Sequence, residues 1–143
     1  MKTLKQLLAE KNRLPVVVSP KDMVFHALQV MADNGVGAVL VMDGERLVGI
    51  FSERDYARKI ALANKNSKET PVSEVMTSKV AYVTPENTVS ECMTLMTEHR
   101  FRHLPVLGNE GELLGLVSIG DMVKATIREQ KFIIAQLEHY IAQ

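Results

Sequence analysis

The chain has 143 residues, of which 46% are hydrophobic and 24% charged, so it can bury a core without disulfides or metal ions. Seventeen basic residues balance seventeen acidic ones, which argues against non-specific binding to nucleic acid. The sequence has one cysteine, a polar N-terminal segment and no apolar run near the ~20 residues of a membrane span. We therefore expect a cytoplasmic protein that does not associate with a membrane.

The first part of the chain is expected to run helix, strand, helix. Residues 4–10 have the apolar spacing of a short helix. Residues 16–18 are β-branched and are followed by Ser-Pro, which indicates a strand and then the start of a helix. Apolar residues at helical spacing over 24–31 predict that next helix, and Gly35 is expected to end it.

A hairpin and a further helix are expected next. The runs 38–42 and 47–51 have the length and composition of strands, and an Asp-Gly pair between them is a typical hairpin turn. Ser52 is expected to cap the following helix. Asp55 then lies in the first turn, where the helix dipole favours an acidic side chain.

The same order of elements is predicted again after a polar segment. Residues 64–70 indicate a linker, and 72–76 a short helical turn. The second series consists of a strand at 81–83, a helix at 87–100, strands at 104–107 and 113–117, and a long helix at 118–142.

The two series are copies of one unit. An offset of 65 residues aligns VSP at 18–20 with VTP at 83–85, and after a one-residue insertion an offset of 66 aligns GIFSERD at 49–55 with GLVSIGD at 115–121. We predict an α/β fold in which a β-α-β-β-α unit occurs twice. The expected boundaries are an N-terminal helix at 1–13, a first unit at 14–63, a linker at 64–74, a second unit at 75–128 and a C-terminal helical extension at 129–143.

The repeated Gly-aliphatic-aliphatic-Ser-x-x-Asp motif is the main candidate for function. Each copy lies where a buried strand meets a helix N-terminus, a place suited to anions. The serine can donate to a phosphate or sugar oxygen, and the aspartate can accept from two ribose hydroxyls. The alternative is that Ser52 and Ser118 are ordinary caps and that Asp55 and Asp121 are ordinary first-turn acids.

The tandem units and their twin motifs resemble paired CBS domains (cystathionine-β-synthase-type domains), in particular the stand-alone bacterial two-CBS proteins. The resemblance covers about residues 14 to 127. It implies two pseudo-symmetric units packed through their sheets, with clefts between them for adenine nucleotides. AMP or NAD(H) is the ligand expected first, with ADP, ATP or S-adenosylmethionine as alternatives.

The resemblance also implies roles for individual residues. The motif aspartates would hold ribose, the motif serines would lie near ribose or phosphate, and apolar residues would sandwich the adenine. The expected nucleotide-binding residues are Val18, Ser19, Pro20, Ile50, Ser52, Arg54, Asp55 and Arg58 from the first unit, and Val83, Thr84, Pro85, Arg100, Arg102, His103, Leu116, Ser118, Asp121 and Lys124 from the second.

The basic residues make the two clefts unequal. Arg54 and Arg58 flank Asp55, whereas the second copy has Gly120 and Lys124 at those places. We therefore expect the cleft at Asp55 to be the better nucleotide site. The alternative for the arginines at 100 and 102 is that they only solvate a helix end, where cations are favoured.

We expect neither a metal site nor catalysis. His99 and His103 are four residues apart, but the helix should end near Arg100, so the two imidazoles would not share a face. Cys92 lies among apolar residues and is interpreted as core. No Cys-His or Ser-His-Asp set and no glycine-rich phosphate loop is recognisable.

The leading hypothesis is thus a non-catalytic sensor of adenine nucleotides whose downstream protein partner is unknown. The alternatives are a scaffold with vestigial clefts and an enzyme that uses a bound nucleotide. We also expect a homodimer, because the apolar residues of 132–141 would cover each other in two copies. In the alternative, Leu4, Leu7 and Leu8 of the same chain provide that cover.

Overall fold

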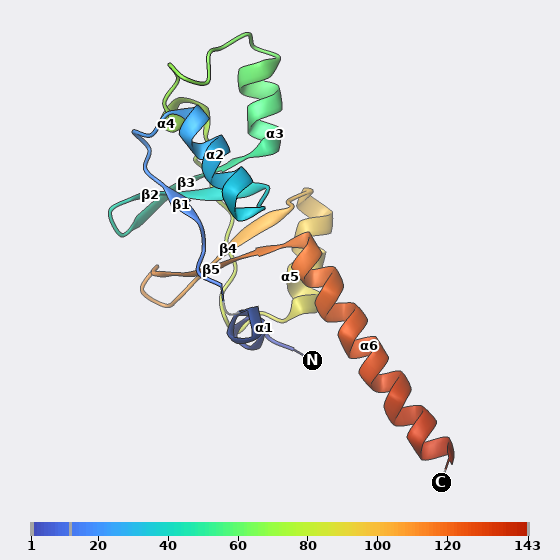
Figure 1. Ribbon diagram of the computed structural model, residues 1–143. Coiled ribbons are helices and arrows are strands. Elements are labelled where there is room, and N and C mark those ends of the chain that lie inside the picture. Colours follow the sequence, from blue (N-terminus) through green and yellow to red (C-terminus); the bar gives the residue numbers. More distant parts are fainter. Residues whose placement is uncertain (1, 12, 143) are drawn as a thin grey trace.

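The computed structural model describes residues 2–11 and 13–142 as two β-α-β-β-α units with flanking helices, which confirms the predicted fold class (Figure 1). The elements are α1 (Leu4–Lys11), β1 (Val17–Val18), α2 (Val24–Asn34), β2 (Ala38–Asp43), β3 (Arg46–Ser52), α3 (Glu53–Tyr56) with a π-helical turn η1 (Ala57–Ala61), α4 (Val72–Val75), α5 (Val89–His99), β4 (His103–Leu107), β5 (Leu113–Ser118) and α6 (Ile119–Ala142). The two small sheets lie next to each other at the middle of the molecule.

The two sheets differ in one strand. In the first unit β1 pairs in parallel with β2, and β2 pairs antiparallel with β3. In the second unit β4 and β5 form the same hairpin, but the strand expected at 81–83 is reduced to one bridge between Val83 and Val106. The reason is Pro105: its counterpart Leu40 donates its N–H to the carbonyl of Val16, and proline has no N–H to extend the ladder.

The helix ends follow local sequence signals. Gly35 ends α2 in the left-handed conformation, with φ 62°, as predicted. The helix expected at 87–100 begins at Val89, because Thr88 and Glu91 form a capping box, and it ends at Arg100, which takes the left-handed conformation with φ 58°. The π-helical turn η1 was not expected from the sequence.

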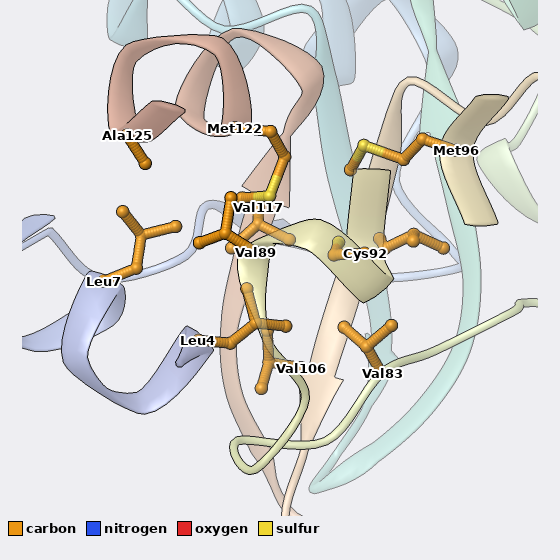
Figure 2. Packing of buried hydrophobic residues seen from close by; sticks show 11 residues of the cluster. Leu4, Leu7, Val83, Val89, Cys92, Met96, Val106, Val117, Met122 and Ala125 are labelled. Carbon is orange, nitrogen blue, oxygen red and sulfur yellow. The ribbon is translucent and has the colours of Figure 1, made fainter. Parts of the chain in front are cut away.

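Each unit is completed by the helix that precedes the other unit along the chain. Val72 and Val75 of α4 are buried in the core of the first unit. Leu4 and Leu7 of α1 are buried in the core of the second, among Val83, Cys92 and Met122 (Figure 2). The alternative in which α1 covers the apolar residues of 132–141 is therefore wrong, because those residues are exposed.

Matching backbone bonds hold these two helices. Ser73 N donates to the carbonyl of Pro20 and Val72 N to that of Asp22. In the same way, Lys5 N donates to Pro85 and Leu4 N to Asn87. The Ser-Pro and Thr-Pro turns of the two units thus each hold the N-terminus of a helix from outside their own unit.

The glycines of the repeated motif make room for the same crossing. A Cβ on Gly49 would lie 2.5 Å from Sδ of Met76, and a Cβ on Gly115 would lie 2.6 Å from Cδ2 of Leu8. Each glycine lies in the last strand of its unit, directly under the segment that crosses from outside. A side chain at Gly49 would have to displace Met76, and one at Gly115 would have to displace the side chain of Leu8.

Candidate functional site

The first repeated motif forms a closed set of hydrogen bonds at the start of α3. Ser52 Oγ accepts from the backbone N–H of Asp55, and Asp55 Oδ2 accepts from the backbone N–H of Ser52 at 3.0 Å and from its hydroxyl at 3.1 Å. This is a capping box, so Ser52 does cap the helix and Asp55 is an acid of its first turn. The box also fixes the direction of the Asp55 carboxylate.

The second oxygen of that carboxylate faces Thr77, in the segment after α4, and Lys59. Asp55 Oδ1 accepts a hydrogen bond from the hydroxyl of Thr77 at 3.2 Å and lies 3.0 Å from Nζ of Lys59. Asp55 is 9% exposed, which makes it one of two polar residues buried in the described part of the chain. A buried carboxylate held by four donors is a preorganised hydrogen-bond acceptor.

A cavity of about 460 Å³ opens beside Asp55, between the two units. This volume falls in the range of about 300–1,000 Å³ that is usual for small-molecule sites. Its walls are formed by Gly37, Ile50, Ser52, Glu53, Arg54, Asp55, Arg58, Lys59, Thr77, Lys79, Val80, Ala81, Arg100, Phe101, Arg102, His103 and Leu104. The cavity is therefore shared by β3 and α3 of the first unit and by the approach to β4 of the second.

Positive charge is concentrated at this cavity although the whole chain is neutral. Six lysine and arginine residues line it against two acidic ones. Guanidinium groups in particular suit the bidentate recognition of phosphate oxygens. Ile50, Val80 and Ala81 add apolar wall next to the charged side chains. The arrangement suits a ligand that has a flat apolar part, hydroxyls and phosphate.

The structure brings eight of the eighteen expected residues to this cavity. They are Ile50, Ser52, Arg54, Asp55, Arg58, Arg100, Arg102 and His103. The other ten do not line it. Val18 and Val83 lie in the two cores, and Ser19, Pro20, Thr84 and Pro85 form the turns that hold α4 and α1. Leu116, Ser118, Asp121 and Lys124 belong to the second motif.

The second motif has the same local geometry but different surroundings. Ser118 Oγ accepts from the backbone N–H of Asp121, and Asp121 Oδ2 accepts from the backbone N–H of Ser118 at 2.8 Å. Lys11, at the end of α1, donates to the same Oδ2 at 2.8 Å and to the carbonyl of Leu116 at 2.9 Å. A side chain of the same chain thus occupies the carboxylate that was expected to bind ribose.

The charges around Asp121 lower its pKa. Burial by itself raises the pKa of this carboxyl, but the hydrogen bond from Lys11 and those from Ser118 outweigh it, so the pKa lies below its ordinary value. Asp121 is therefore a carboxylate whose counter-ion, Lys11, belongs to the same chain.

His103 connects the two regions. It lines the cavity, and burial lowers its pKa below the ordinary value, opposed by Asp121 and Glu53 and assisted by Lys11 and Arg102. Its imidazole also lies 3.8 Å from the position that a Cβ on Gly37 would take. The side chain thus contacts the first unit from the start of β4.

Several lining residues were not expected from the sequence. Lys59 belongs to the π-helical turn, and Thr77, Lys79, Val80 and Ala81 belong to the segment between α4 and Val83. Only the repeat could have indicated them. The residues that follow α4 contact the first motif in the same way as α1 contacts the second motif.

The structure shows neither a metal cluster nor a membrane span among the residues it describes. Within residues 2–11 and 13–142, no three His, Cys, Asp or Glu side chains are grouped to hold a metal ion. Over the same ranges, no helix combines the length and the hydropathy needed to cross a bilayer.

A protein-family model places this chain among known proteins. The model described as "CBS domain" matches twice, at residues 8–62 and 72–128. The mitochondrial CBS domain-containing protein CBSX3 of Arabidopsis thaliana is 44% identical over 125 residues, which are 84% of this chain and 60% of CBSX3. The chain thus spans about three fifths of that relative's length.

Solved structures of CBS proteins have the same fold. A CBS domain protein designated NE2398 superposes with a TM-score of 0.84 at 53% identity, covering 88% of this chain and 98% of that one. A protein with CBS domains from Burkholderia ambifaria gives 0.83 at 49% identity, covering 90% and 96%. PAE2072 from Pyrobaculum aerophilum, solved in complex with AMP, gives 0.74 at 26% identity, covering 83% and 88%.

Proposed function

The chain belongs to the CBS-domain family, whose proteins are regulatory modules, and on that premise we propose that it senses adenine nucleotides in the cavity at Asp55 without chemistry of its own. AMP and NAD(H) are the nucleotides we propose first. Support comes from PAE2072 and from CBSX2, a 25% identical neighbour, both of which were solved with AMP.

The observation that carries this proposal is the pairing of Asp55 with a basic cavity. The carboxylate would exchange Thr77 and Lys59 for the two ribose hydroxyls. Arginines from both units, Arg58 and Arg102 among them, would contact the phosphate, and Ile50 with Val80 would contact the base. A ligand held by both units favours the arrangement in which the two units are together. It shifts the equilibrium between the arrangements of the units by the difference between its affinities for them.

We propose one nucleotide site in each chain. The cleft at Asp121 is supplied with a cation by Lys11, and Leu8 of α1 packs over Gly115. A nucleotide there would have to displace α1, which is held by two buried leucines. This inequality agrees with the expectation from the sequence, and the structure adds α1 as a second reason for it.

We further propose that the protein is a homodimer located in the cytoplasm. The support for the dimer is the C-terminal part of α6, which extends away from both units and exposes Phe132, Leu137, Tyr140 and Ile141 (Figure 1). Light scattering of the full-length chain and of a chain truncated after Arg128 tests whether the C-terminal part of α6 holds the dimer together. A monomeric full-length protein would contradict the homodimer.

The nucleotide proposal is tested by releasing and identifying bound small molecules. Mass spectrometry of the denatured protein, with thermal unfolding in millimolar AMP, NAD(H), ADP and ATP, should identify an unaltered adenine nucleotide that raises Tm. If no nucleotide of this panel raises Tm, the proposal is wrong and the scaffold alternative remains. A chemically altered nucleotide would favour an enzyme.

A further inference from the structure

The C-terminal half of α6 is a helix without cover. Met122 and Ala125 are the last residues of α6 that are buried in the core of the second unit. Every residue from 131 to 142, which we name the tail, is exposed. The tail continues a helix whose first half is already packed, so it needs no partner to be helical, but its apolar side chains lie in water.

Six of the exposed apolar residues of α6 form one continuous stripe, whereas Phe132 lies on the opposite side of the helix. Its members are separated by four, four, seven, three and four residues: Ile119, Val123, Ile127, Ile134, Leu137 and Ile141. At about 100° per residue, the stripe is turned by roughly a third of a circle from the face that Met122 and Ala125 bury. It is therefore a second face of α6, distinct from the one that packs on the second unit.

From Ile127 onward this stripe has heptad spacing. Ile127, Ile134 and Ile141 repeat every seven residues, with Leu137 between the last two, as at the a and d positions of a coiled coil. Ile133 and Tyr140 lie beside the stripe on its apolar border, and Lys131 and Glu138 lie beside it on its polar border. The other d position of this short repeat is Gln130, so the pattern suits a short pairing with another helix of the same kind.

The charges select one orientation for a second copy of this chain. In an antiparallel pair, residues on the same border face each other, so Lys131 meets Glu138 of the partner and Glu138 meets its Lys131. In a parallel pair, Lys131 would meet Thr126 and Glu138 would meet Ile133, with no charge complemented. We propose that α6 pairs antiparallel with α6 of a second copy, in the register that joins Lys131 to Glu138.

This proposal fixes where the two-fold axis crosses the helix. With Lys131 level with Glu138, the axis passes midway between them, at residues 134 and 135. Ile134 then lies about 1.5 Å along the helix from its own copy, while Ile141 lies about 20 Å from its copy. The inference rests on the proposed homodimer and is independent of nucleotide binding.

Single cysteines in the tail test the orientation directly. Ile134→Cys should form a disulfide-linked dimer under mild oxidation, and the matched control Ile141→Cys should not, because disulfides need Cα atoms within about 7 Å. The native Cys92 is 0% exposed, so the full-length chain can be used without removing it. Both substitutions fall where every side chain is exposed, which leaves the folded units intact.

Charge reversal tests the register. Lys131→Glu and Glu138→Lys should each weaken the dimer by roughly three- to tenfold in Kd, since each affects two pairs per dimer, and the double variant should restore it. Arg128→Glu is the control, because Arg128 is exposed near the middle of the polar face rather than at the border of the stripe.

The outcomes separate this proposal from the others. Cross-linking at both positions would mean a parallel pair and would overturn it. Cross-linking at neither, with a dimer still seen in light scattering, would overturn it and leave the homodimer to another surface. A protein that is monomeric throughout would overturn both. Thermal shifts of the same variants with AMP report on nucleotide sensing separately.

Discussion

Nζ of Lys11 lies 2.8 Å from Oδ2 of Asp121, so the N-terminal helix neutralises the aspartate of the second repeated motif. The aspartate of the first motif, Asp55, also has a lysine partner, Lys59 at 3.0 Å, but it lines an open cavity. Two copies of one motif, with the same capping box, therefore have different surroundings. That difference leads to the first two predictions.

Lys11→Ala should destabilise the protein by about 1–2 kcal/mol at neutral pH, because a half-buried carboxylate loses its charged partner. The pKa of Asp121 is lowered in the folded state, so its contribution is present above the ordinary value of 3.8 and is lost as the pH falls through the folded pKa. The deficit of the variant should therefore shrink near pH 3. Urea unfolding at both pH values measures this.

Lys2→Ala is the control. It removes a more exposed ion pair, with Glu10 of the same helix α1, and should change the stability little.

Asp55→Ala should weaken nucleotide binding at least tenfold, whereas Asp121→Ala should leave it nearly unchanged. Each substitution removes one capping box, so the two variants are matched for loss of helix capping. Calorimetric titration with AMP measures the difference. Equal losses would contradict a single site at Asp55.

Arg102→Ala should reduce the affinity for AMP but not for adenosine, because the guanidinium is proposed to contact phosphate and not the nucleoside. If Arg102 served only to solvate the end of α5, both affinities would stay unchanged. Competition titrations with the nucleotide and the nucleoside distinguish these outcomes. Lys124→Ala, an exposed cation on α6 away from the cavity, is the matched control.

His103 should make the folded protein sensitive to mild acid. Burial lowers its pKa in the folded state, so the unfolded chain binds more protons between the two pKa values. The stability associated with the neutral imidazole should be complete above the ordinary value of 6.5 and decline as the pH falls below it. His103→Gln should remove this part of the pH dependence, as measured by urea unfolding between pH 5 and 7.5. A variant that declines as steeply as the parent would show that another group is responsible; His26→Gln, on an exposed histidine, is the control.

The amino-acid sequence by itself determined what depends on neighbours along the chain. The repeat, the hairpins, the end of α2 at Gly35 and the positions of Ser52 and Asp55 were all predictable, because turns, caps and periodicity act over a few residues. The same holds for the family, since its repeated motif lies in one short segment of each unit.

Only the tertiary structure decided which segments meet. That α1 completes the second unit and α4 the first depends on burial of Leu4 and Val72 against residues far away in sequence. The position of Lys11 on Asp121, and of Thr77 on Asp55, follows from that crossing. Likewise, Pro105 limits the strand at 81–83 only because it lies opposite that segment in space. Contacts of this kind come from packing two apolar cores at once, and no local pattern encodes them.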